Sequence, residues 1–161
     1  MNPIQINNEA PLKDGILILL ADDDEDDRMM TADALREAKV FNKLRSVADG
    51  EELMDYLRHL GKYAPPAESP RPDLLLLDLN MPRKDGREVL REMKADPLFR
   101  AIPVVILTTS KTREDVEHIY DLGANSFITK PVSFEGLVKA VKVIGEYWFQ
   151  IVRLPKGSRG N

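Results

Sequence analysis

Short apolar runs that end in polar residues constrain the fold of this chain more than any other feature. Continuous apolar runs of this length suit strands that are buried on both faces of a parallel sheet. The amphipathic segments between the runs predict helices, so strand and helix alternate five times along the chain. The five runs, of which the second is weaker, are residues 16–20, 44–48, 74–77, 104–107 and 127–128.

This alternation predicts an α/β fold, a doubly wound five-stranded parallel sheet with helices on both faces. We expect the strand order 2-1-3-4-5, one of the common orders of such sheets. Thr112 and Ser133 precede apolar stripes and are expected to be helix N-caps. Met29 and Met30 lie in the first stripe and are expected in the core, while the proline-rich residues 61–72 predict an irregular loop.

The composition narrows the class of protein. A chain of 161 residues, 43% of them hydrophobic, suits one domain, which we place at residues 14–152 between a flexible segment 1–13 and a tail 153–161. The net charge of -4 argues against general nucleic-acid binding, and the lack of cysteine excludes disulfides, thiol catalysis and cysteine-bound metals. No apolar stretch approaches the ~20 residues of a membrane helix, and none resembles a signal peptide. We therefore expect a cytoplasmic protein without a membrane partner.

Four of the expected strands end in polar residues. Asp22 and Asp23 follow the first run, Asp78 the third, Thr108 the fourth and Lys130 the fifth. In a doubly wound sheet, the carboxyl ends of the strands form the binding crevice at the point where the strand order reverses. We therefore expect the acidic pair and Asp78 to meet between the first and third strands.

Three carboxylates at one place repel each other unless a cation or protons intervene. The candidate ligands are all hard oxygens, which favours Mg²⁺. The ion could bind Asp23, Asp78 and the main-chain carbonyl of Asn80, with Asp22 acting through water or holding the lysine of the fifth strand. A carboxylate can attack a phosphoryl group to form an acyl phosphate. The lysine and the hydroxyl at the neighbouring strand ends could then stabilise the charge on the phosphoryl oxygens.

Four motifs, LLADDD, LLLLDLNMPRKDG, VVILTTS and FITKP, occur in this order along the chain. In order and spacing they resemble the response regulator receiver domain of two-component signalling, over most of the chain. The resemblance implies the flavodoxin-like receiver fold. It implies that Asp78 accepts the phosphoryl group, that Asp23 binds the metal directly, and that Lys130 pairs with a phosphate oxygen. It also implies that Thr108 and Phe127 form the switch that responds to the phosphate.

Three further features resemble a narrower group, the single-domain response regulators that accompany bacterial phytochrome kinases. These features are the proline-rich loop, the TTS that ends the fourth run, and the sequence EYWFQIVRLP near the C-terminus. This resemblance implies that the partner is a sensor histidine kinase of the bacteriophytochrome type. It also implies a signalling protein, not an enzyme, that assists only its own phosphorylation and dephosphorylation.

Aromatic and aliphatic residues crowd the last helix and the tail. One helix face cannot bury all of them against its own domain, and an apolar patch that is left over often marks an interface. We expect a two-fold homodimer through the last helix and its tail, with the fourth helix and fifth strand; the alternative is a tail folded back on its own domain. The expected interface residues are Tyr147, Trp148, Phe149, Ile151 and Val152.

Other functions fit the same residues less well. A phosphatase of the haloacid-dehalogenase type would carry a second acid two residues after its nucleophile, where this chain has Asn80. A receiver-like scaffold that is never phosphorylated is disfavoured by the intact set of Asp23, Asp78, Thr108 and Lys130. In a flavodoxin-like electron carrier, the acidic cluster would repel the flavin phosphate. Asp26 and Asp27 are expected only to favour the start of the next helix.

Overall fold

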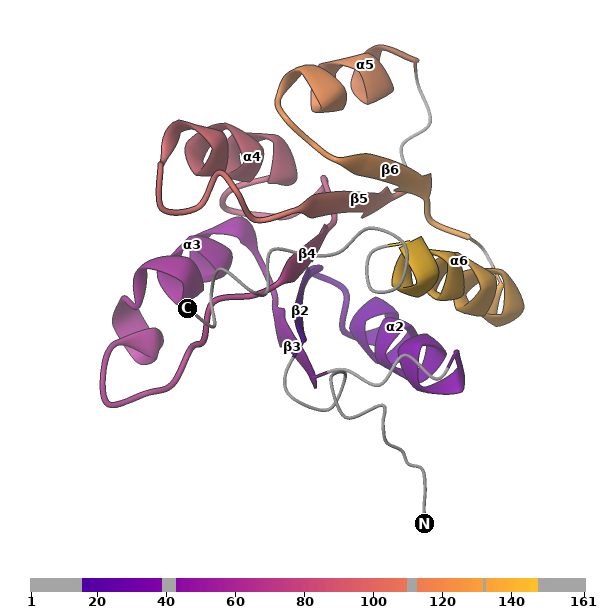
Figure 1. Cartoon of the computed structure of the whole chain (residues 1–161), viewed down its shortest axis with the longest axis horizontal. Helices are drawn as coiled ribbons and strands as arrows, with labels where there is room; N and C mark the ends of the chain where they lie inside the picture. The colour runs from indigo at the N-terminus through magenta and orange to yellow at the C-terminus, as the bar shows by residue number, and fades with distance from the viewer. Residues whose placement is uncertain (1–15, 39–42, 110–112, 132, 148–161) are drawn as a thin grey trace.

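Five parallel strands form one sheet in the order β3-β2-β4-β5-β6, which confirms the order predicted from the sequence (Figure 1). The computed structural model describes residues 16–38, 43–109, 113–131 and 133–147. In the register of the sheet, Leu17 lies opposite Lys43 and Val105 opposite Ser126. The strands are β2 (Leu17–Ala21), β3 (Lys43–Val47), β4 (Leu74–Leu77), β5 (Val104–Thr108) and β6 (Ser126–Thr129).

Burial along the strands explains the continuous apolar runs. Every residue of β2 and β4 is buried, because both strands lie inside the sheet and helices cover both of its faces. Strand β3 lies at an edge of the sheet and exposes Lys43 and Arg45. Charged residues discourage pairing with another chain at an edge strand, and they account for the weak apolar pattern of this segment.

Two layers of helices enclose the sheet (Figure 1). On one face α2 and α6 lie side by side and bury residues such as Leu35 and Val141. The other face is covered by α3, α4 and α5 through residues such as Leu53, Val89 and Ile119. None of the helices in the described part of the chain is long and apolar enough to cross a membrane. The helices are α2 (Glu25–Glu37), α3 (Gly50–Arg58), α4 (Gly86–Ala95), α5 (Arg113–Asp121) and α6 (Phe134–Glu146).

Side-chain caps fix where several helices begin. Asp49 and Asp85 accept main-chain N–H hydrogen bonds at the starts of α3 and α4. Ser133 does the same for α6, with 3.0 Å between its hydroxyl oxygen and the nitrogen of Gly136, so the prediction for this residue is confirmed. The predicted cap Thr112 lies outside the described residues. Each cap satisfies an N–H group that the helix itself leaves unpaired.

The prediction that Met29 and Met30 belong to the core is wrong. Their side chains are 60% and 37% exposed. The buried residues of α2 are Thr31, Ala34 and Leu35, which keep the i, i+3, i+4 spacing of one helix face. The two methionines are not among the buried residues of this face.

The loop between α3 and β4 is irregular, as predicted, but side chains fasten it to α3. It starts with a short 3-10 helix, η1 (Gly61–Tyr63). The hydroxyl of Tyr56 donates to the main-chain carbonyl of Pro70 at 2.7 Å, and Ser69 Oγ lies 2.7 Å from His59 Nδ1. These contacts hold the second half of the loop against the end of the helix.

A change at Tyr63 tests a further contact of this loop. Its hydroxyl donates to Glu52 Oε2 at 2.6 Å. Burial alone would raise the pKa of Glu52, but hydrogen bonds from this hydroxyl, Ala48 N and Lys62 outweigh burial and lower the pKa. Ionised Glu52 therefore stabilises the fold above its ordinary pKa of 4.5, and this contribution is lost as the pH falls through the lowered value. We expect Tyr63→Phe to lower the free energy of unfolding by about 1 kcal/mol at pH 7 and by less in acid.

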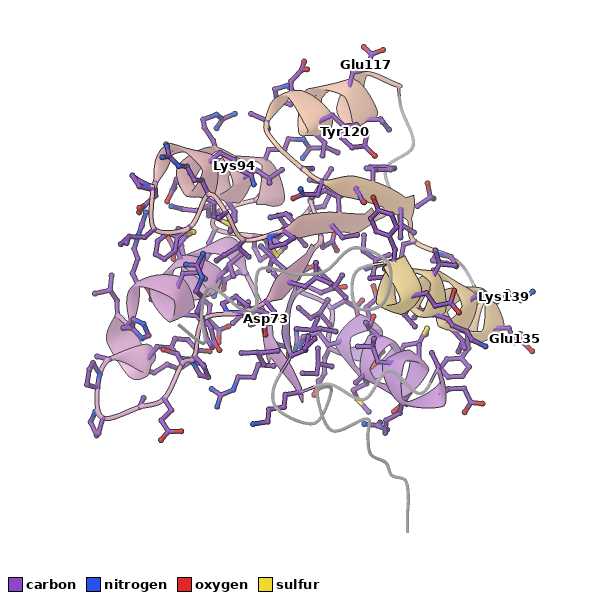
Figure 2. All side chains as sticks on the ribbon, viewed as in Figure 1. Asp73, Lys94, Glu117, Tyr120, Glu135 and Lys139 are labelled. Carbon is purple, nitrogen blue, oxygen red and sulfur yellow. The ribbon has the colours of Figure 1, made fainter. Side chains whose placement is uncertain are left out.

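Urea denaturation at pH 7 and in acid below the lowered pKa of Glu52 measures this difference. Tyr120 lies on α5 with 46% of its surface exposed and serves as the matched control (Figure 2). We expect Tyr120→Phe to change the free energy of unfolding by less than about 0.5 kcal/mol. A Tyr63→Phe effect that is equal at both pH values would rule out ionised Glu52 as its source.

Candidate functional site

The carboxyl ends of β2 and β4 bring two aspartates together. Asp22 directly follows β2 and Asp78 directly follows β4, and the two strands are neighbours in the sheet. The main-chain ladder continues through both residues: Asp22 N donates to Val47 O at 3.1 Å, and Asp78 N donates to Ala21 O at 2.9 Å. The sheet itself therefore fixes the position of each aspartate.

Three carboxylates meet at this edge of the sheet. Oxygens of Asp22, Asp23 and Asp78 all lie within 4.8 Å of one another. Asp22 and Asp78 are buried, at 1% and 8% exposure, whereas Asp23 is exposed. The cluster therefore has a closed inner side and an open outer side. Its hard oxygen donors suit Mg²⁺ or Mn²⁺ and offer nothing to a metal that prefers sulfur.

Lys130 lies among these carboxylates. Its Nζ is 2.8 Å from Asp22 Oδ2, 2.9 Å from Asp27 Oδ2 and 3.4 Å from Asp78 Oδ2. Burial alone would lower the pKa of Lys130, but the three carboxylates outweigh burial and raise the pKa above its ordinary value. The lysine is therefore charged and offsets part of the negative charge of the cluster.

Asp22 is the most buried acid of the cluster. Burial raises its pKa, and the contacts with Lys130 and the Asp24 N–H limit the rise. Asp24 N donates to Asp22 Oδ1 at 3.0 Å, and Arg28 Nη1 donates to the main-chain oxygen of Asp22 at 2.8 Å. Residues at the start of α2 thus hold both the side chain and the main chain of Asp22.

The expectation that Asp27 only favours the start of a helix is wrong. Its carboxylate contacts Lys130, which is 103 residues later in the chain. Asp24 is the N-cap of α2 and accepts the Asp27 N–H at 3.1 Å. This hydrogen bond marks Asp27 as the third residue of the helix, where a side chain can reach back toward the strand end. The DDDEDD run places an acid at this helical position, but its contact with Lys130 depends on the tertiary structure.

The segment after Asp78 packs closely against α4. Asn80 N donates to Asp78 Oδ1 at 3.1 Å, and Gly86 N donates to Leu79 O at 2.8 Å. A Cβ atom added at Gly86 would lie 2.6 Å from Asp78 O, closer than side chains are found. The missing side chain of Gly86 is therefore what lets α4 begin beside Asp78. Asn80 is exposed, at the open side of the cluster.

The two predicted switch residues lie on neighbouring strands. Thr108 is the last residue of β5 and lies opposite Thr129 in the sheet. Phe127 lies opposite Ile106, and its half-buried ring packs against the core on the side of α3, α4 and α5. The register places Thr108 at the same edge of the sheet as the acidic cluster.

The predicted interface residues are only partly described. Tyr147, at the end of α6, is 46% exposed. Trp148, Phe149, Ile151 and Val152 lie outside the described residues. Val143, one turn before Tyr147, is 60% exposed. The outer side of α6 thus carries exposed apolar groups up to the last residue that is described.

Residues 18–142 match the family described as the response regulator receiver domain. The chain belongs to this family. As a receiver, it signals through phosphorylation, takes the phosphoryl group from a histidine kinase and binds a divalent metal ion. The receiver identification made from the sequence is confirmed, and the phosphatase alternative is not favoured.

Known relatives are similar to this receiver over most of their length. Response regulator Rcp1 of Synechocystis sp. is 41% identical over 139 residues, which are 86% of this chain and 92% of Rcp1. The crystal structure of the phosphorylated cyanobacterial phytochrome response regulator RcpA has a TM-score of 0.80 and 45% identity, covering 88% of this chain and 99% of RcpA. The Mn²⁺-bound crystal structure of Rcp1 has a TM-score of 0.78 and 41% identity, covering 86% of this chain and 98% of Rcp1.

Proposed function

We propose that Asp78 is the phosphoryl acceptor of this receiver. The observation that carries the proposal is the position of Lys130 Nζ, 3.4 Å from Asp78 Oδ2 and 2.8 Å from Asp22 Oδ2. A fixed positive charge beside a carboxylate is what the transfer of an anionic phosphoryl group needs. Asp23, the remaining aspartate of the cluster, is exposed, so the site is open to solvent on the side of Asp23.

In the transfer, an oxygen of Asp78 forms a bond to phosphorus as the bond to the phosphohistidine nitrogen breaks. The electron pair of the broken bond returns to the imidazole, and an acyl phosphate results. Asn80 N holds Oδ1 of Asp78 at 3.1 Å, which leaves Oδ2, the oxygen nearer to Lys130, for the attack. Lys130 then pairs with an oxygen of the phosphoryl group.

Asp23, Asp78 and the main-chain carbonyl of Asn80 would hold the metal, with Asp22 acting indirectly. The oxygen donors favour Mg²⁺, which when bound offsets the charge of the carboxylates and of the incoming phosphoryl group. Asp22 takes a second role, because its contact with Lys130 at 2.8 Å keeps the ammonium group in place. Asp27 supports the same position from the start of α2 at 2.9 Å.

Thr108 and Phe127 form the switch in this proposal. The hydroxyl of Thr108 would donate to the phosphate, and the movement of β5 would be passed to the neighbouring strand. Phe127 packs against the core, and as a phenylalanine it can respond only by a change in packing. The surface made by α5, β6 and α6 is then the part that changes its protein contacts.

The phosphoryl donor in this proposal is a bacteriophytochrome-type histidine kinase. The support is the similarity to Rcp1 and to RcpA, a phytochrome response regulator. Transfer from a phosphorylated bacteriophytochrome should be faster than from a histidine kinase without a light-sensing module. We also propose that the receiver spans residues 14–152. A cytoplasmic location and the lack of a nucleic-acid partner are part of the same proposal.

Metal dependence tests the proposed site. We expect the full chain to gain one phosphoryl group by intact mass when it is incubated with Mg²⁺ and acetyl phosphate. With EDTA in place of Mg²⁺ we expect at least a tenfold slower gain, because the repulsion among the carboxylates and the phosphate is then not offset. Labelling that is equally fast in EDTA would contradict the metal site, and steady hydrolysis of acetyl phosphate without retained label would favour a phosphatase.

We further propose a homodimer through α6 and the residues after it. Val143 and Tyr147 are 60% and 46% exposed on α6, and apolar residues at a chain end that a single domain cannot bury favour self-association. We expect light scattering to give twice the chain mass for the full protein and the single mass for a chain that ends at Glu146. Equal masses for the two proteins would mean that the tail is not the dimerisation element.

A further inference from the structure

A pocket of about 360 Å³ lies at the end of the sheet opposite to the acidic cluster. Pro72 lines the pocket just before β4, whereas Asp78 follows the other end of the same strand. The remaining walls come from the end of α3 and from the loop after α4. Pockets for small molecules typically have volumes of roughly 300–1,000 Å³ and mostly apolar walls. The volume of this pocket lies in that range, and its apolar lining residues include the exposed Leu98 and the buried Tyr56, Leu57 and Phe99.

Hydrogen bonds hold the walls of the pocket in place. Ser69 Oγ lies 2.7 Å from His59 Nδ1, which joins the proline-rich loop to the end of α3. The guanidinium of Arg71 donates to the main-chain carbonyl of Leu98, which joins this loop to the one after α4. Asp96 Oδ1 accepts the Leu98 N–H at 2.9 Å and closes the turn there. The pocket is therefore formed before any ligand arrives.

The charged groups around the pocket differ in the partners that they contact. Asp96 is the acid that lines it, and its carboxylate accepts a main-chain N–H. Arg58 forms an ion pair with Glu92, with 3.4 Å between Arg58 Nη2 and Glu92 Oε1. Arg71 has no carboxylate within ion-pair distance among the residues that the structure describes, and its side chain is exposed. Arg71 is thus a positive charge in the lining of the pocket that forms an ion pair with no described acid.

Leu98 adds an exposed apolar group to the same lining. It lines the pocket and is 69% exposed, among the most exposed of the large apolar residues that are described. A ligand that covers it would remove apolar surface from water, which is favourable. The best occupant therefore combines an apolar body with one negative group.

We propose that this pocket binds a small amphipathic organic acid, with its apolar body against Leu98 and its carboxylate toward Arg71. The proposal does not rest on phosphorylation of Asp78, because the two sites lie at opposite ends of β4. A carboxylate is favoured over a neutral ligand because a charge-assisted hydrogen bond from a guanidinium is the stronger kind.

Octanoate and octan-1-ol, which share a chain length and differ in charge, are the probes. Two-dimensional amide NMR of the full chain follows each titration. We expect octanoate to shift the amides of Leu57, His59 and Phe99 in a saturable way, and to bind at least fivefold more tightly than octan-1-ol. We expect Arg71→Gln to weaken octanoate binding about fivefold more than octan-1-ol binding, because the charge-assisted contact is lost with octanoate only.

Arg36→Gln is the matched control, because Arg36 is an exposed arginine on α2, on the other face of the sheet. It should bind octanoate as the wild type does. The proposal is overturned if octanoate shifts no pocket amide, if octan-1-ol binds equally well, or if Arg36→Gln and Arg71→Gln weaken binding equally. Broadening of the same amides with protein concentration alone would assign the pocket to a second copy of the chain and would also overturn it.

Discussion

Asp78→Asn is expected to abolish phosphoryl acceptance. The substitution keeps the size of the side chain and the acceptor for the Asn80 N–H, which lies 3.1 Å from Asp78 Oδ1 in the wild type. It removes the nucleophilic carboxylate, and an amide oxygen does not form a stable acyl phosphate. With Mg²⁺ and acetyl phosphate, intact mass should show one added phosphoryl group on the wild type and none on the variant.

The matched control for this experiment is Asp121→Asn, the same change at an exposed residue of α5. We expect it to be labelled as fast as the wild type. Equal labelling of Asp78→Asn and the wild type would remove Asp78 from the central role. Loss of labelling in both variants would point to a general effect of charge instead of the loss of one acceptor.

Lys130→Met is expected to have the largest effect on stability in the absence of metal. The ammonium group contacts three carboxylates, at 2.8, 2.9 and 3.4 Å. Methionine keeps most of the volume but leaves the buried Asp22 without its cation. Removing one partner of a buried ion pair typically costs 3–5 kcal/mol, and we expect a loss of about 3 kcal/mol in the free energy of unfolding. Urea denaturation at pH 7 with EDTA measures this loss.

Mg²⁺ should recover part of the stability of Lys130→Met, because a bound cation replaces the missing positive charge. The exposed Lys139 on α6 supplies the control (Figure 2). Lys139→Met should change the free energy of unfolding by less than about 0.5 kcal/mol. Midpoints in urea that agree between Lys130→Met and the wild type would mean that the lysine does not stabilise the cluster.

The strands could be predicted from local patterns, and the place of the site followed once a common strand order of doubly wound sheets was expected. The apolar runs are continuous because β2 and β4 are buried on both faces, and this burial is a direct property of a parallel sheet. Once the strands are placed, Asp22 and Asp78 must meet, because they end neighbouring strands. Their chemistry then follows from their residue types.

The contact between Asp27 and Lys130 could not be predicted in this way. It joins two residues that are 103 positions apart, and it depends on how the first turn of α2 sits above the strand ends. The same holds for Met29, which shares a helical segment with buried residues but is 60% exposed. Small rotations of a helix decide such contacts, and the residue pattern sets a helix face only to within about one residue.

The sequence by itself therefore determined the alternation of strands and helices and the set of acids and cations at the carboxyl ends of the strands. Only the tertiary structure decided that Lys130 bridges three carboxylates, and that the proline-rich loop closes a pocket at the opposite edge. The physical reason is the range of the interactions. Burial and strand direction repeat along the chain and leave a periodic signal, whereas a cluster or a pocket depends on side chains from separate elements meeting at distances of a few ångströms.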